Sequence, residues 1–331
     1  MTHEILNANQ TQYNHVLAFE ISKAEHHVHS EPAGDSCKIA NDRATIRRLI
    51  KKEMRRNAKL DIGPLLVICE ATGSYSLAVL EVAAELGVAC HRAHGSRVRA
   101  FARFRGTHAK SDPIDVRVIA DFGCSSKGLL LYAPPRAEQV ELRELVERRT
   151  ELRQTKEAEE NRVEHVRSKV AADSLRAHIR WLDGVLAKID KRIDELVKTD
   201  EYFRKTAKLM QSVHGVGRVT AVTVLAHLPE IGTVSAGTIA ALAGLAPFEC
   251  DSGVFKGQRH IFGGREEART GLYMAAKVAM VGNAHLRALA ERIQARGKPF
   301  KVAATAVMRK LLIILNAIVA SGQPCRMQNA T

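Results

Sequence analysis

The sequence predicts an α/β domain, a long helical segment and a mainly α-helical C-terminal domain, in that order. Strand and helix patterns alternate over residues 15–125, as expected of an α/β domain. Residues 133–205 are dense in Glu, Arg and Lys, and from about residue 206 the chain becomes rich in Ala, Gly and Leu. Because 331 residues exceed one ordinary domain, we expect two or three domains. The expected boundaries are a tail over 1–14, domains over 15–127, 128–205 and 206–322, and a tail over 323–331.

The first domain opens with three short strand patterns. HVLAFEIS, HHVHS and SCKIA are expected to pair as a meander, and RATIRRLIKKEMRRNA follows with the apolar spacing of an amphipathic helix. LLVICEA predicts a strand buried on both faces, SYSLAVLEVAAELG a helix that ends at a Gly, and VACHRAH another strand. Three antiparallel strands followed by β-α-β units is the element order of an RNase H-like fold.

A further helix is predicted over the segment DPIDVRVIADFG. Asp112 is expected at its N-cap, Pro113 at the first helical position and Gly123 near its end. Asp112 and Asp115 are three residues apart, so both carboxylates lie on one face of this helix.

The charged segment predicts two long helices. The run PPRAEQVELRELVERRTELRQTKEAEENRVEHVRSKV contains no Gly. Further on, apolar residues recur at three- and four-residue spacing: Leu182, Val185, Ile189, Ile193 and Leu196. This pattern indicates a helical hairpin or a coiled coil with charges on its solvated faces. Such an insertion suits dimerisation or spanning DNA.

The C-terminal domain is predicted to contain a Gly turn that leads into an apolar helix, in SVHGVGRVTAVTVLAHL. Backbone N–H groups at Gly215 and Gly217 would suit a phosphate, and the element resembles a helix-hairpin-helix that holds a DNA backbone. An ordinary structural turn is the alternative. SAGTIAALAGLAP and LRALAERIQARGKP predict further helices, and KVAATAVMRKLLIILNAIVA predicts an apolar core helix.

Four acidic residues are candidate metal ligands. Glu20 and Glu70 each close an apolar strand, where an unpaired charge is costly to desolvate. Together with Asp112 and Asp115 they could converge on one divalent ion, because hard oxygen ligands suit Mg²⁺ or Mn²⁺. The alternative is structural: Asp112 caps its helix and Asp115 favours the positive helix end.

A basic stretch precedes this helix. The formal charge is +14 and the pI is near 9.7, a balance that favours polyanionic partners. Residues 91–117 hold seven Lys or Arg against two Asp. The candidate phosphate contacts are Arg97, Arg99, Arg103, Arg105 and Lys110. Phe101 and Phe104 lie among them, either to stack on bases or to anchor a short helix in the core.

Ser252, in the Gly-flanked segment GLAPFECDSG, is a candidate nucleophile. The alternative is an ordinary turn serine. Four basic residues that follow could stabilise a phosphorane-like transition state: Lys256, Arg259, Arg265 and Arg269. The sequence has no G-x-S-x-G motif, which excludes an esterase of that type.

Cysteine usage and hydropathy indicate the cellular compartment of the protein. The six cysteines include no C-x-x-C pair and no zinc spacing, which favours a reducing cytoplasm. The polar N-terminus MTHEILNANQTQYN lacks the apolar core of a signal peptide, and LLIILNAIVA is far shorter than the ~20 residues of a membrane span. We therefore expect a soluble cytoplasmic protein with no membrane partner.

Seven segments together resemble the insertion-sequence transposases that share a DEDD domain with the Piv and MooV invertases, the group guided by a bridge RNA. The segments are FEISKA, CEATGSY, RVRAFARFRGTHAKSDPIDVRVIA, SVHGVGRVTA, LAGLAPFECDSGVFKGQRHI, LYMAAKVA and GKPFKVAATAVMRKLL. They run from about residue 15 to 320 in the family's order. The segments AKSDPIDVRVIA and LAGLAP…SG are the specific ones.

The resemblance implies a RuvC-like N-terminal domain whose tetrad of Glu20, Glu70, Asp112 and Asp115 binds Mg²⁺. It also implies a C-terminal serine, here Ser252, that attacks DNA to form a covalent phosphoserine. The implied partners are element-end and target DNA, a non-coding guide RNA, and further copies in a dimer or tetramer.

One position departs from the family pattern. The first acidic residue is normally Asp, in a context such as D-V-S-K, whereas here Glu20 stands in FEISK. The extra methylene displaces the carboxylate, and Mg²⁺ is intolerant of geometry. Reduced activity, a preference for Mn²⁺ and a degenerate element copy are all open.

Two other functions fit parts of the pattern. The acidic cluster alone would suit a RuvC-like metal-dependent nuclease that cuts branched DNA by water attack, in which Ser252 takes no part. A catalytically degenerate nucleic-acid-binding protein would retain only the basic surfaces. A covalent protein–DNA adduct distinguishes the recombinase from both.

Overall fold

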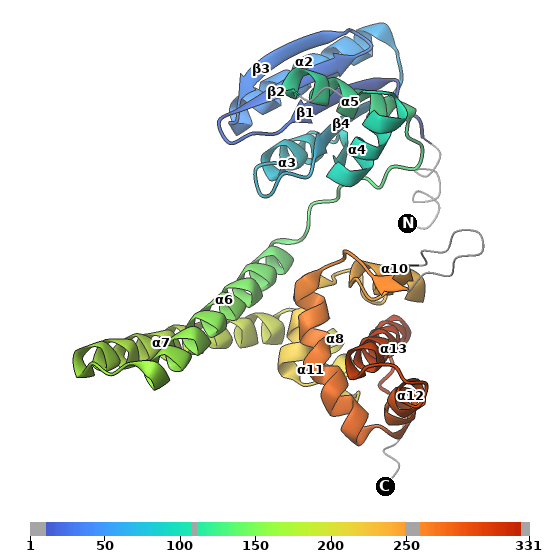
Figure 1. Cartoon of the computed structure of the whole chain (residues 1–331). Helices are drawn as coiled ribbons and strands as arrows, with labels where there is room; N and C mark the ends of the chain where they lie inside the picture. The colour runs from blue at the N-terminus through green and yellow to red at the C-terminus, as the bar shows by residue number, and fades with distance from the viewer. Residues whose placement is uncertain (1–10, 108–110, 249–258, 326–331) are drawn as a thin grey trace. The chain divides into compact units, whose positions relative to one another are not determined.

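The computed structural model describes residues 11–107, 111–248 and 259–325. The chain divides into two compact units, Met1–Pro134 and Pro135–Thr331 (Figure 1). Each unit has its own hydrophobic clusters and is described by itself below.

The first unit is built on a five-stranded mixed sheet. Its strands are β1 (His15–Glu20), β2 (Glu25–Glu31), β3 (Asp35–Ala40), β4 (Leu65–Glu70) and β5 (Ala89–Ala93). The order across the sheet is β3-β2-β1-β4-β5. Strands β1, β2 and β3 pair antiparallel, which confirms the predicted meander, and β4 and β5 continue the sheet in parallel with β1.

Helices cover both faces of this sheet. On one face, α2 (Arg43–Leu60) and α3 (Leu77–Glu85) pack against alternate apolar side chains of β1 and β4. On the other face lie α4 (Gly95–Phe104) and α5 (Asp112–Ser125). Burial on both faces explains why β1 and β4 read as continuous apolar runs rather than alternating ones.

Helix α5 begins one residue earlier than the sequence predicted. Ser111, not Asp112, is the N-cap, with φ −158° and ψ 151°. The backbone N–H groups of Ile114 and Asp115 both donate to the Ser111 carbonyl at 2.8 Å, and these bonds close the first turn. Asp112 is therefore the first helical residue, so its carboxylate does not cap the helix.

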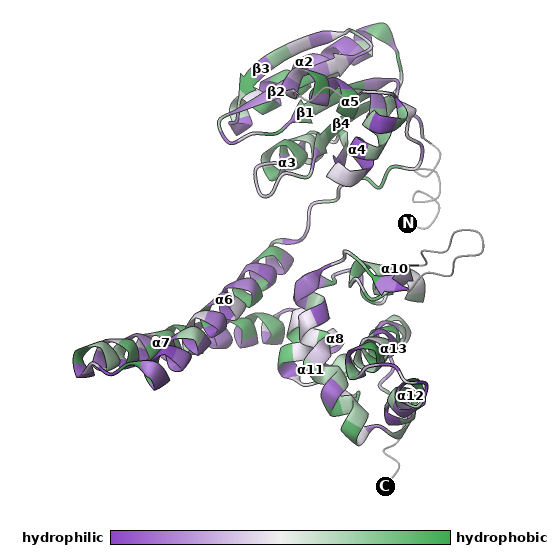
Figure 2. Cartoon of the chain, viewed as in Figure 1, coloured by the Kyte–Doolittle hydropathy of each residue, from purple (hydrophilic) through white to green (hydrophobic). Residues whose placement is uncertain are grey.

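The second unit begins with a helical hairpin. Helix α6 (Ala137–His165) packs along α7 (Lys169–Thr199), and ion pairs between the two run in antiparallel register: Glu141 with Arg192, Arg149 with Asp190, and Lys156 with Asp183. The predicted stripe on α7 is buried or half-buried within the hairpin and its base. Figure 2 shows hydrophilic and hydrophobic residues alternating along both helices.

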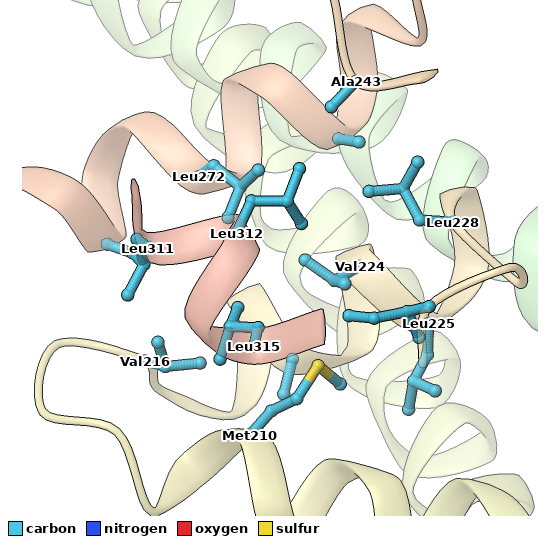
Figure 3. Close-up of a cluster of buried hydrophobic side chains, with 14 of the residues drawn as sticks. Met210, Val216, Val224, Leu225, Leu228, Ala243, Leu272, Leu311, Leu312 and Leu315 are labelled. Atoms are coloured by element: carbon cyan, nitrogen blue, oxygen red, sulfur yellow. The ribbon is translucent and has the colours of Figure 1, made fainter. Parts of the chain in front are cut away.

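The remaining helices form the core of the second unit. They are α8 (Glu201–Gln211), α9 (Arg218–His227), α10 (Ala236–Leu242), α11 (Glu266–Gly282), α12 (Ala284–Gln294) and α13 (Phe300–Ser321). Leu311, Leu312 and Leu315 of α13 pack against side chains from α8, α9 and α11 (Figure 3). Helix α11 was not predicted, because its exposed apolar residues obscure the amphipathic pattern.

The apolar stretch near the C-terminus is longer than the sequence analysis assumed. Helix α13 has 22 residues, and by length and composition it is the one helix of the described chain that could cross a membrane. Half of its apolar window is buried inside the protein. That burial is expected of a core helix.

Candidate active site

Glu20 and Glu70 end two neighbouring parallel strands at the same edge of the sheet. Phe19 on β1 is in register with Cys69 on β4, so the next residue on each strand is Glu20 and Glu70. Side chains alternate along a strand. Since Phe19 and Cys69 face the α2/α3 side, both glutamates face the α4/α5 side and are partly exposed.

Helix α5 brings two aspartates to this face. It packs against β1 and β4 through Val116 and Ile119, with Asp112 and Asp115 in its first turn. The carboxylate of Asp112 is 66 % exposed, and its Oδ2 lies 3.4 Å from Nδ1 of His27. Because His27 is directly opposite Glu20 in the β1/β2 ladder, it lies on the same face as that glutamate.

His27 was missed by the sequence reasoning. In HHVHS the histidines read only as strand residues, because their facing partners depend on the length of the turn between β1 and β2. Lys38 on β3 contributes further positive charge. Its pKa is raised, first by its hydrogen bond to Glu25 and further by the nearby Asp112 carboxylate. Asp112 therefore has the Lys38 ammonium and the His27 ring on its sheet side.

The carboxylate of Glu70 lies directly against the start of α4. A Cβ built on Gly95 would overlap Glu70 Oε1 and would lie 3.5 Å from an Arg99 guanidinium nitrogen. Gly95 has an ordinary backbone conformation, so space for Glu70, rather than an unusual φ, calls for glycine here. Arg99 lies near the same carboxylate from the next turn of α4.

The carboxylate oxygens of the four acidic residues are chemically suited to a hard divalent cation. The four carboxylates of β1, β4 and α5 carry oxygen atoms of the kind that Mg²⁺ and Mn²⁺ prefer as ligands. Among the described residues, no three His, Cys, Asp or Glu are close enough to hold an ion as arranged. Like charges repel at short range, which disfavours a close approach of these carboxylates without positive charge between them.

The basic stretch lies mainly on α4. Arg97, Arg99, Arg103 and Arg105 are all exposed, and Lys110 lies outside the described residues. Arg97 lies 5.6 Å over the ring of Phe122, and Arg105 pairs with Asp121 at 3.6 Å.

The two phenylalanines of α4 have different roles. Phe101 makes an edge contact with Phe122 at 5.6 Å and packs on the core. Phe104 is 85 % exposed. Of the two, only Phe104 is available to a base.

Ser252 and Lys256 lie outside the described residues. The chain on either side forms a short antiparallel ribbon, β6 (Pro247–Phe248) and β7 (His260–Ile261), with Phe248 opposite His260. Arg259 is exposed just before β7.

Two other arginines predicted near the serine have structural roles. Arg265 makes a two-pronged ion pair with Glu230, at 2.5 and 2.6 Å, and donates to the His227 carbonyl at 2.8 Å. Arg269 donates to the Gly263 carbonyl at 2.9 Å. The prediction that both face a transition state did not anticipate these partners.

The Gly turn joins α8 to α9. Gly215 has φ +91°, and a Cβ there would lie within 3 Å of backbone atoms of Ala275 and Ala279 on α11. Close helix packing is therefore one reason for this glycine. Gly217 is the N-cap of α9, and a Cβ there would meet nothing within 4 Å. Only the second glycine leaves open space for a ligand.

Comparison with known proteins gives two family matches. Residues 20–169 match a family of DEDD transposases of the IS110 group, described as transposase, and residues 207–291 match the transposase IS116/IS110/IS902 family. The pilin gene-inverting proteins of Moraxella bovis and Moraxella lacunata are each 27 % identical over 271 residues, which cover 78 % of this chain and 81 % of each relative.

These matches define the class: the protein is an enzyme of DNA recombination. Within that class, the two transposase domains and the gene-inverting relatives support an IS110-type transposase or recombinase.

Proposed function

We propose that the protein cuts and rejoins DNA through a covalent intermediate on Ser252, assisted by Mg²⁺ or Mn²⁺ held by Glu20, Glu70, Asp112 and Asp115. The observation that carries the proposal is the arrangement of the sheet edge. Two strand-terminal glutamates share one face with the first turn of α5, and this edge belongs to a chain with transposase matches in both parts.

The proposed role of Ser252 is that of the nucleophile in phosphoryl transfer. In the proposed step the Ser252 Oγ forms a bond to phosphorus, and the bond from phosphorus to one deoxyribose oxygen breaks. The oxygen of the released strand end takes up a proton and leaves as a hydroxyl. Attack on the phosphoserine by the corresponding hydroxyl of a second strand would then form a new phosphodiester bond, break the bond from phosphorus to the serine oxygen and release Ser252. A serine hydroxyl is a weak nucleophile, so a base or a metal must accept or displace its proton.

A bound divalent cation would supply Lewis-acid stabilisation of phosphate oxygens. The four carboxylates would hold it, and Gly95 leaves room for the Glu70 side chain. Arg99 lies near Glu70, where its positive charge limits the repulsion between carboxylates, and His27 lies beside Asp112.

We also propose that a non-coding RNA guides the enzyme, that it acts as a dimer or tetramer on element-end and target DNA, and that it works in the cytoplasm. These features follow from the family resemblance. The exposed arginines of α4 and the open N-cap of α9 are the proposed backbone contacts for the nucleic acids. Lys110, Lys256 and Arg259 are proposed with them.

A suicide DNA substrate tests the proposal, with guide RNA supplied from the DNA that flanks the gene. Denaturing electrophoresis and mass spectrometry should detect a protein–DNA adduct at Ser252. Ser252→Ala should abolish the adduct, and Asp115→Asn should abolish strand exchange and weaken Mn²⁺ binding in titration calorimetry.

The alternatives predict different results. An adduct that persists in Ser252→Ala would disprove the serine assignment. Metal-dependent cleavage without an adduct would indicate a nuclease that uses water, and DNA binding without either reaction would indicate a degenerate element copy.

A further inference from the structure

A pocket of about 530 Å³ lies between the β6/β7 ribbon and helix α13. This volume is within the range of ~300–1,000 Å³ typical of small-molecule sites. Its apolar lining includes Leu245, Pro247, Ile261, Val302 and Ala306. The pocket therefore provides an apolar surface against which a flat ring would be buried away from water.

The same pocket is strongly basic. Arg259, Lys301, Arg309 and Lys310 line it, and none of the lining residues that the structure describes is acidic. Within the described ranges, the three from α13 form no ion pair with an acidic residue. Apolar walls with several cations suit a ligand that has both an apolar ring and a phosphate.

Arg309 adds an independent observation. Its Nε is buried, and no acceptor among the described residues lies within hydrogen-bond distance. A buried donor without an acceptor costs free energy, and a base carbonyl or a phosphate oxygen would satisfy it. Thr305 donates its hydroxyl hydrogen to the Lys301 carbonyl at 2.8 Å, so its oxygen remains an acceptor toward a ligand.

We propose that this pocket binds one unstacked nucleotide of the DNA strand that is cut. The base lies against the apolar wall, and Lys301, Arg309 and Lys310 contact the phosphates beside it. Enzymes that need a single nucleotide out of the stack hold it in this way, between apolar side chains and hydrogen-bonding groups.

The location of the pocket links it to the proposed reaction, and the inference rests on that proposed function. Pro247, His260 and Ile261 line the pocket and belong to the two strands that bracket Ser252 in the sequence. Ser252 follows Pro247 by five residues in the sequence, and five residues of chain span at most about 18 Å. A strand attacked by Ser252 would therefore pass within a few nucleotides of the pocket.

Fluorescence anisotropy of the full-length protein tests the pocket with two probes. One is a short labelled oligothymidine, and the other is the same strand annealed to oligoadenosine. Ala306→Phe fills the apolar wall and should weaken single-strand binding about tenfold or more, because stacking contributes roughly 1–3 kcal/mol per base. Binding to the duplex should change less than about twofold.

Two controls separate the pocket from general effects. Ala317→Phe places the same ring at an exposed position of α13 that does not line the pocket, and it should leave both affinities unchanged. If Ala306→Phe does not fold, Val302→Trp replaces it, because Val302 is 47 % exposed. Lys310→Gln should reduce the salt slope of single-strand binding by about 0.7.

Unchanged single-strand affinity in folded Ala306→Phe and Val302→Trp would overturn the inference. Tighter binding of the matching oligouridine than of oligothymidine would also overturn it, in favour of an RNA site. The adduct assay with Ser252→Ala tests the serine chemistry independently of the pocket. An absent adduct with intact single-strand discrimination would reject only the serine chemistry.

Discussion

The position of the Glu70 carboxylate depends on the absence of a side chain at Gly95. A Cβ at that position would overlap the far end of Glu70, which is flexible enough to move away. Gly95→Ala should therefore weaken Mn²⁺ binding and strand cleavage by about tenfold or more. Folding stability should hold or rise slightly, because Ala favours a helix over Gly. Calorimetric metal titration and thermal unfolding measure the two effects.

Gly184 on α7 provides the matched control for that substitution. A Cβ there meets nothing within 4 Å, so Gly184→Ala should stabilise the protein by about 0.5–1 kcal/mol without changing metal affinity. Equal metal affinity in wild type and Gly95→Ala would show that Glu70 does not bind the ion.

The Glu20 side chain is one methylene longer than the Asp of the family pattern, and a substitution tests the effect of that difference. If its length misplaces the carboxylate, Glu20→Asp should raise the cleavage rate in Mg²⁺ and reduce any preference for Mn²⁺. Cleavage rates measured in Mg²⁺ and in Mn²⁺ under the same conditions give the preference for one metal over the other. A lower rate in Mg²⁺ would show that this site has adapted to Glu.

Glu53 is a buried carboxylate outside the site. Its pKa is lowered, first by the hydrogen bond with His15 (3.2 Å) and also by the one from Ser30 (2.8 Å), although burial alone would raise it. A lowered pKa means that its stabilisation is present above the ordinary value of 4.5 and is lost as the pH falls through the lower folded-state pKa.

Glu53→Gln should therefore be less stable than wild type at neutral pH, by about 1–3 kcal/mol. The difference should shrink below pH ~4, and urea unfolding at several pH values measures it. A constant difference across that range would show that protonation of Glu53 is not the cause.

At the level of secondary-structure elements, the order of strands and helices in the first unit followed from apolar periodicity. The exact helix start did not, because Ser111 and Asp112 are both good N-cap residues and only the hydrogen bonds to the Ser111 carbonyl decide between them. The roles of Gly215 and Arg265 also depended on distant partners, on α11 and at Glu230. The pairing of β1 with β4 brought Glu20 beside Glu70, as the strand-end pattern suggested.

The hairpin of α6 and α7 changes the expectation for self-association. Its apolar stripe is buried against its own partner helix, so the stripe itself is not free to bind another copy. Two other apolar side chains on α7 are exposed, Val170 at 81 % and Trp181 at 57 %. We predict that a second copy binds there and that Trp181→Glu lowers the molar mass in light scattering.

Ala187→Glu, at another exposed position of α7, is the control and should keep the parent oligomer. Deleting the whole hairpin would be a poor test, because Leu142 and Ile193 at its base belong to the core of the second unit. A Trp181→Glu protein of unchanged molar mass would place the contact elsewhere.

At the scale of the whole molecule, the chain is exposed over residues 133–138, on both sides of the boundary between the two units. Just before this boundary, the side chain of Leu130 is 86 % exposed, while its carbonyl accepts a hydrogen bond from His91 Nδ1 at 2.7 Å, and Tyr132 donates its N–H to the Cys90 carbonyl at 2.6 Å. Brief chymotrypsin treatment should cut first after Leu130, before either core opens. Mass spectrometry should then find two fragments that both resist further digestion. First cuts within α6 or α7 would show that the hairpin opens more easily than the linker.

The length of the hairpin has a further consequence. A helix of 31 residues is about 46 Å long, more than one turn of B-DNA. If two copies meet through Val170 and Trp181, the hairpin acts as a spacer whose residue count sets the distance between the two C-terminal cores. Removing one heptad from each helix would shorten that spacer by about 10 Å. The enzyme would then select for DNA ends held at a different separation, although no residue that touches DNA had changed.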